Sequence, residues 1–169
     1  MAAKKNPFTH LSGNKEASMV SIGDKSLTQR TATAECRVLL PPELQQALKD
    51  NELYTPKGAV FETARLAGIM AVKKTADLIP LCHTILIEKC SFSFGIEESG
   101  SVLIRCTVGT TGKTGVEMEA LTGAGIAALT IYDMCKAVSH DIVIGPLQLA
   151  AKSGGKRDFS RDPQPGKER

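Results

Sequence analysis

The alternation of apolar and polar residues along the chain predicts four β-strands. The clearest is 31–40, where every second residue is apolar, which is the period of a half-buried strand. The other predicted strands are 85–99, 101–111 and 141–151. Ser99-Gly100 between the first two of these indicates a hairpin turn. Gly145-Pro146 inside the last one indicates an edge strand or a bulge.

Three segments between these strands predict helices. A short amphipathic helix is expected over 41–50, after Pro41-Pro42, and a long helix over 59–79. The longest, 114–138, is apolar almost all the way round, which is typical of a buried helix. It nevertheless carries four charged residues, namely Glu117, Glu119, Asp133 and Lys136. Because buried charges are almost always paired, this helix is expected either to pair them or to present them to a binding site.

The order of these elements predicts the fold class. A hairpin combined with crossover helices indicates an α+β fold, with an antiparallel sheet covered by helices and a ferredoxin-like arrangement. We expect a flexible N-terminal arm over 1–18, a single domain over 19–156 and a flexible C-terminal tail over 157–169. The apolar excess of both long helices exceeds what one 169-residue subunit hides, so an oligomer is expected.

Composition narrows the possible functions. Aromatic residues make up 4% of the chain and Trp is absent, which argues against a protein that stacks nucleic-acid bases. A net charge of +3 suits an anionic small molecule better than nucleic acid. Five cysteines without a CxxC motif favour a reducing, cytoplasmic location. No segment is long and apolar enough for a membrane span, and no secretory signal is recognisable.

The long helix offers the clearest candidate chemistry. At about 100° per residue, Glu119, Asp133 and Lys136 fall on one stripe, and Glu117 points the other way. One interpretation is a solvated stripe with an ion pair between Asp133 and Lys136. The other is a partly dry site where the aspartate and the lysine transfer protons. We favour the second interpretation because the surrounding residues are apolar.

The start of this helix resembles a phosphate-binding loop only superficially. Gly112-Lys113-Thr114 matches the end of a Walker motif, but residue 107 is Thr where the first glycine must stand. Thr114 and Glu117 instead predict a capping box, in which the two side chains satisfy the first free N–H groups.

Several other polar residues are candidates for binding. Cys82 and His83 follow Pro80, but two ligands are too few for a closed zinc site, so His83 is predicted to contact substrate. Lys57, Lys136 and Lys152 would together form a basic pocket for a polyphosphate, although their spacing alone does not bring them together.

Three segments resemble the MoaC family. They are KGAVFETARLAGIMAVKKTADLIPLCHTI (57–85), TGKTGVEMEALTGAGIAALTIYDMCKAV (111–138) and VIGPLQLAAKSGGK (143–156). The similarity covers roughly 19–156, and the stretches GVEMEALT, TIYDMCKAV and LIPLCH are long and specific.

The resemblance implies a lyase, a cyclic pyranopterin monophosphate synthase of molybdenum cofactor biosynthesis. Its expected substrate is (8S)-3′,8-cyclo-7,8-dihydroguanosine 5′-triphosphate, and its products are cyclic pyranopterin monophosphate and diphosphate. The resemblance also implies a homohexamer, a trimer of dimers, with active sites at subunit interfaces. The sequence requires no cofactor and leaves Mg²⁺ as an optional companion of the triphosphate.

The resemblance further assigns site residues. Asp133 is the expected acid–base catalyst, and Lys136 and Lys57 are the other expected catalytic residues. The expected substrate-binding residues are Leu81, Cys82, His83, Met118, Glu119 and Lys152. Glu117 is added to them because its position at the helix start suits both a cap and the site. The chain departs from the family pattern at Gly123 and Gly125, which permit closer helix packing, and at Ser21, so no role is carried onto 19–30.

One alternative belongs to another functional class, a non-catalytic module that binds nucleotides or RNA. The scarcity of aromatics, the mild charge and the acid–base residues inside an apolar helix all argue against it.

Overall fold

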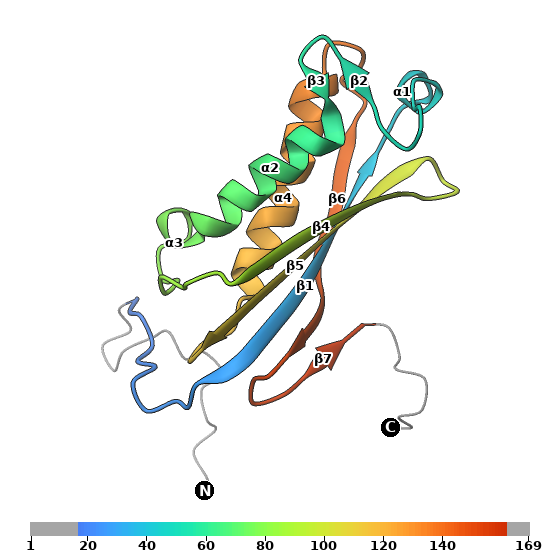
Figure 1. Ribbon diagram of the computed structural model, residues 1–169. Helices are drawn as coiled ribbons and strands as arrows, with labels where there is room; N and C mark the ends of the chain where they lie inside the picture. Colours follow the sequence, from blue (N-terminus) through green and yellow to red (C-terminus); the bar gives the residue numbers. More distant parts are fainter. Residues whose placement is uncertain (1–16, 162–169) are drawn as a thin grey trace, which may run out of the picture.

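The computed structural model describes residues 17–161, which form one antiparallel sheet with helices packed against it (Figure 1). Residues 1–16 of the expected arm lie outside the described residues, as does the tail beyond 161. The strands follow the spatial order β4-β5-β1-β6-β7, and every neighbouring pair is antiparallel. Their bounds are β1 Thr28–Leu39, β4 Lys89–Ile96, β5 Ser101–Gly112, β6 Val143–Ser153 and β7 Phe159–Ser160.

Two long helices lie side by side across one face of this sheet (Figure 1). They are α2 (Val60–Lys73) and α4 (Glu117–Cys135), and α4 contacts β1, β5 and β6 directly. Two short helices, α1 (Pro42–Gln46) and α3 (Thr75–Leu78), join the longer elements. A separate two-stranded hairpin, β2 (Tyr54–Thr55) and β3 (Gly58–Ala59), precedes α2.

The predicted alternation in the first strand is confirmed. Four alternate residues of β1 are fully buried under α4: Ala32, Ala34, Cys36 and Val38. On β5 the buried apolar positions are Val102, Ile104, Cys106 and Val108, and Ala34 lies opposite Cys106 in the register. Burial of these two rows against the small residues of α4 supplies the main hydrophobic stabilisation of the fold.

Some elements differ from the sequence prediction. The helix expected over 41–50 ends at Gln46, and the strand expected over 85–99 begins only at Lys89. The helix expected over 59–79 breaks at Lys74, which has φ −111° and separates α2 from α3. The loop expected over 51–60 contains the β2–β3 hairpin. The hairpin escaped prediction because two-residue strands carry no readable alternation.

The last long strand bulges where the sequence predicts an irregularity. Cys36 pairs with Leu147 and Val38 pairs with Ile144, so Gly145 and Pro146 together stand opposite one residue of β1. Of the two expected irregularities, an edge strand or a bulge, the structure shows a bulge at this point. The short strand β7 lies within the segment 157–169 that was expected to form a tail. It pairs with Ala151 and Lys152 of β6.

Within residues 17–161, no helix has both the length and the apolar composition needed to cross a membrane.

Candidate active site

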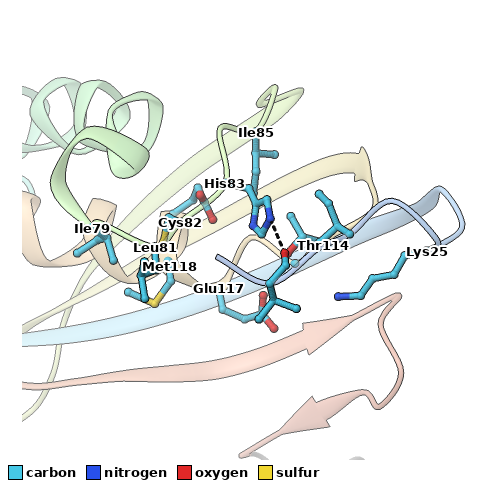
Figure 2. A pocket seen from close by; sticks show the side chains of 13 residues that line it. Lys25, Ile79, Leu81, Cys82, His83, Ile85, Thr114, Glu117 and Met118 are labelled. Carbon is cyan, nitrogen blue, oxygen red and sulfur yellow. Dashed lines mark hydrogen bonds between the residues drawn. The ribbon is translucent and has the colours of Figure 1, made fainter. Parts of the chain in front are cut away.

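A cavity of about 530 Å³ opens at the N-terminal end of α4 (Figure 2). Three parts of the chain form it: the first turn of α4 with the residues before it, the loop after α3, and an extended segment that precedes β1. Its lining residues are Val20, Ile22, Lys25, Ile79, Leu81, Cys82, His83, Ile85, Thr114, Gly115, Glu117, Met118 and Glu119. Six of the predicted substrate-binding residues therefore lie around one cavity, and Lys152 pairs with one of them.

Glu119 is the most deeply buried acid of this cavity. Its residue is only 3% exposed, and burial raises the pKa of its carboxyl above the ordinary value. The thiol of Cys82 also has a raised pKa, mainly from burial and secondarily from the negative charge of Glu119. A carboxyl with a raised pKa inside a cavity is suited to proton donation.

The loop residue His83 is fixed by a backbone contact. One nitrogen of its imidazole, Nε2, lies 2.9 Å from the carbonyl oxygen of Val20, and Figure 2 shows this contact as a dashed line. The bond joins the loop after α3 to the segment before β1, so the two walls of the cavity hold each other in place.

The expected capping box at the start of α4 is wrong. Val116 is the N-cap residue, and no side chain caps the helix there. The Glu117 carboxylate instead accepts a 2.9 Å hydrogen bond from Nζ of Lys152 on β6. The helix begins at Glu117, two residues later than a capping box with Thr114 requires, and the Glu117 carboxylate makes a charge-assisted hydrogen bond instead.

The predicted acid–base residues form a second cluster at the other end of α4. Lys136 Nζ lies 2.7 Å from Oδ1 of Asp133, and Lys57 Nζ lies 3.1 Å from Oδ2. Hydrogen bonds from Lys136 and then Lys57 lower the pKa of Asp133, and Asp133 raises the pKa of Lys136. At neutral pH the cluster is therefore one carboxylate held between two ammonium groups.

This cluster is open to solvent in the single chain. The side chains of Asp133, Lys136 and Lys57 are 54%, 49% and 59% exposed. The expected partly dry site is therefore not formed within one subunit. Within one chain, the exposed ion pair of Asp133 and Lys136 agrees with the first of the two interpretations, a solvated stripe.

The two clusters are separated along the helix. At 1.5 Å per residue, Glu119 and Asp133 stand about 21 Å apart on α4. Such a separation is too large for both carboxyl groups to contact the same atoms of one small substrate. Within one chain the predicted stripe is not uniformly exposed, because Glu119 is buried at the cavity and Asp133 is exposed.

Glu117 also lies on the cavity, although helical geometry placed it on the opposite side from Glu119. The cavity closes around the end of α4 and not along one side of it, so residues on different sides of the first turn reach it.

A second, basic cavity of about 590 Å³ adjoins the first and shares Lys25, Thr114 and Gly115 with it. Its further basic lining residues are Arg30, Lys113 and Lys156. Arg30 Nε is buried without a hydrogen-bond partner among the described residues. An unpaired buried donor beside several cations is suited to an anion.

Sequence reasoning missed the contribution of the segment before β1. Val20, Ile22 and Lys25 line the first cavity, and Lys25 lines the second as well. The departure at Ser21 led to no role being carried onto this segment. The signal available was the apolar pair Val20 and Ile22 followed by the cation Lys25.

Comparison with known proteins identifies the family of this chain. A profile of the MoaC family matches residues 19–155. The chain belongs to the MoaC family. It is 53% identical over 154 residues to a cyclic pyranopterin monophosphate synthase of Xanthomonas axonopodis pv. citri, covering 90% of this chain and 92% of that protein.

Two longer relatives contain a similar region. A molybdenum cofactor biosynthesis bifunctional protein of Synechocystis is 48% identical over 92% of this chain and 46% of its own length. Molybdenum cofactor biosynthesis protein 1 of Drosophila melanogaster is 49% identical over 94% of this chain and 28% of its own length.

Proposed function

We propose that this chain is a cyclic pyranopterin monophosphate synthase of molybdenum cofactor biosynthesis. It would convert (8S)-3′,8-cyclo-7,8-dihydroguanosine 5′-triphosphate to cyclic pyranopterin monophosphate and diphosphate. The observation that carries this proposal is the 53% identity to a protein of that name over nearly its whole length.

In this proposal Asp133 is the proton acceptor. Its lowered pKa keeps it ionised at neutral pH, so it can take a proton from the substrate. Lys136 stays protonated because its pKa is raised, and it can donate a proton or stabilise developing negative charge. Lys57 supplies a second cation 3.1 Å from the same carboxylate.

The cavity at the other end of α4 is the proposed binding site. Leu81, Cys82, His83, Met118 and Glu119 would surround the substrate, and Glu117 would hold Lys152 at its edge. The adjoining basic cavity suits the triphosphate, since closing a cyclic phosphate with loss of diphosphate moves negative charge onto the leaving group.

We propose a homohexamer, a trimer of dimers of ferredoxin-like subunits, with each active site at a subunit interface. The separation of the two clusters along α4 supports this arrangement, because another subunit can bring an Asp133 cluster to the cavity of the first. Exposed apolar side chains on α2 and α3 also support it: Leu66, Met70 and Leu78 are more than half exposed in the single chain.

We propose that the reaction needs no cofactor bound by the protein, an expectation that comes from the sequence alone. Among the described residues no three His, Cys, Asp or Glu side chains gather as a metal site. A Mg²⁺ ion accompanying the substrate would therefore take its ligands mainly from the phosphate oxygens. We propose a cytoplasmic enzyme, in line with five free cysteines.

The test is a direct assay with the cyclised GTP intermediate. The purified protein should release diphosphate and form a pterin that fluoresces after oxidation. Binding of the intermediate without either product would reject the synthase and favour a non-catalytic nucleotide-binding module.

A further inference from the structure

Helix α2 begins without a cap from its own N-cap residue. Ala59 occupies that position and has no side chain that can accept a hydrogen bond. The carboxylate of Glu52, which precedes the β2–β3 hairpin, takes over this function. Its Oε1 accepts the N–H of Phe61 at 2.8 Å, and its Oε2 accepts the N–H of Glu62 at 3.3 Å. Two of the free N–H groups at the helix start are satisfied in this way.

The same carboxylate also holds the base of the hairpin. Glu52 Oε1 accepts the N–H of Leu53 at 2.8 Å, and the backbones of Glu52 and Lys49 exchange hydrogen bonds of 2.8 and 2.9 Å. On the returning strand, Val60 donates its N–H to the carbonyl of Leu53 at 2.9 Å. Glu52 therefore fixes both the point where the hairpin leaves the fold and the point where it returns.

The turn of this hairpin carries Lys57. The hairpin is a separate two-stranded sheet, so the main sheet does not fix its position. Thr55 stabilises the turn itself: its Oγ1 accepts the N–H of Lys57 at 3.2 Å and lies 3.3 Å from the carbonyl of Gly58. Lys57 then reaches across to Asp133 on α4. The direction in which Lys57 points thus depends on how firmly the hairpin is anchored at its base.

Glu52 also lies close to the end of α4 that carries Asp133. The negative charge of its carboxylate contributes, after burial, to the raised pKa of the Cys135 thiol. Cys135 is the last residue of α4 and stands between Asp133 and Lys136 in sequence. The carboxylate therefore joins the start of α2, the hairpin base and the last turn of α4.

We propose that Glu52 is a positioning residue of the active site, which anchors the β2–β3 hairpin so that Lys57 is held against Asp133. This inference rests on the proposed synthase function, since it assigns Glu52 to the same site. Loss of the anchor would let the hairpin move and leave Asp133 facing Lys136 alone. A carboxylate that only capped α2 would instead affect stability and not the behaviour of Asp133.

The kinetic test compares Glu52→Ala with wild type and with Glu62→Gln. Glu62 is the matched control, because it is an acid in the first turn of the same helix and, among the described residues, its carboxylate pairs only with Arg65. Glu52→Ala should lower kcat by about tenfold or more, as expected when a reacting group is misplaced. Glu62→Gln should leave kcat unchanged. Glu52→Gln, which keeps an oxygen acceptor, should recover most of the lost activity.

The pH profile separates positioning from stability. In the cluster Asp133 is faced by Lys136 of α4 and Lys57 of the hairpin, and both lower its pKa. With Lys57 displaced, the acid limb of kcat/KM should move to higher pH in Glu52→Ala. In a Lys57→Ala background, Glu52→Ala should cause no further shift. A lowered melting temperature with an unmoved acid limb, or an equal effect in both backgrounds, would overturn the proposal.

A measurement without substrate keeps the inference separate from the proposed function. Pulse labelling with an amine-reactive ester, read by mass spectrometry, should label Lys57 faster in Glu52→Ala than in wild type. Lys89, an exposed lysine on β4, serves as the internal reference and Asp133→Asn as the positive control. If Glu52→Ala does not fold, Glu52→Asp is one methylene shorter and should show the same change. Unchanged labelling of Lys57 in Glu52→Ala rejects the positioning role. If the wild-type protein forms no product, the synthase function is rejected, but the labelling result still tells whether Glu52 positions Lys57.

Discussion

At the scale of single residues, the two acids of α4 differ because their surroundings differ. Asp133 is exposed and held between two lysines, which lower the pKa of its carboxyl. Glu119 is buried at the cavity, and burial raises the pKa of its carboxyl. One helix therefore presents a carboxylate suited to accept a proton and a carboxyl suited to donate one, at opposite ends.

Replacing Asp133 tests the first of these roles. Asp133→Asn should lower kcat by about a hundredfold to ten-thousandfold, since the amide cannot accept a proton. Its melting temperature should change little, because the side chain is 54% exposed. Assays of product formation and thermal melts measure both effects. Glu98→Gln, in the exposed turn between β4 and β5, is the control, and near-normal turnover in Asp133→Asn would remove it from the catalytic residues.

Replacing Glu119 tests the second role through stability. Because its pKa is higher in the folded chain than in the unfolded chain, the folded state binds the proton more tightly. The stability that this group contributes falls as the pH rises from the pKa of Glu119 in the unfolded chain to its pKa in the folded chain. Glu119→Gln should therefore melt at a higher temperature than wild type near pH 7.

That gain should vanish below about pH 4, where the glutamate is protonated in both states. Thermal melts of both proteins across this pH range, at one protein concentration, measure it. Product formation should fall in the same variant because the carboxyl lines the cavity. A melting difference that does not vary with pH would show that ionisation of Glu119 does not affect folding.

At the scale of elements, the close packing of α2 on α4 depends on glycine. A Cβ added at Gly123 would stand 2.6 Å from Cγ2 of Val72 on α2 and 2.9 Å from Sγ of Cys106 on β5. At Gly125 the nearest atom is Cδ2 of Leu147, at an ordinary 3.4 Å. The closer helix approach expected from sequence is thus present at Gly123.

The two glycines should respond oppositely to alanine. Gly123→Ala should destabilise the fold by about 1–3 kcal/mol through overpacking. Gly125→Ala should stabilise it by about 0.5–1 kcal/mol, since alanine loses less conformational freedom in a helix. Denaturant unfolding of the two variants at one protein concentration measures both values. Equal effects of the two substitutions would mean that the helices adjust to the added methyl group.

The sequence predicted those elements whose pattern of apolar and polar residues can be read from neighbouring positions in the chain. Alternation in β1 and the long apolar run of α4 identify those elements directly, and the resemblance to the MoaC family supplied most of the site residues. The ion pair of Glu117 with Lys152 could not be predicted, because the partners lie far apart in sequence and meet only once β6 packs beside α4. The anchoring of the β2–β3 hairpin by Glu52 escaped prediction for a similar reason, as did the cavity wall formed by Val20 and Ile22.

At the scale of the whole molecule, a single chain holds both halves of the proposed site at a distance. The cavity and the Asp133 cluster occupy opposite ends of α4, and apolar side chains of α2 and α3 remain exposed. Both observations are accounted for if subunits pack so that the Asp133 cluster of one faces the cavity of another. Light scattering at micromolar concentration should then give the mass of a hexamer, and a stable monomer would contradict the proposed assembly.

Mixing two inactive variants tests the shared site directly. His83→Ala alters the cavity and Asp133→Asn alters the cluster, so each homo-oligomer should have little activity. If every site combines a cavity and a cluster from different subunits, random reassembly of an equal mixture should restore about a quarter of the sites. Mild unfolding and refolding together, followed by the product assay, measures this recovery. If each site used residues of one chain alone, every site in the mixture would keep one lesion, and activity would stay at the level of the separate variants.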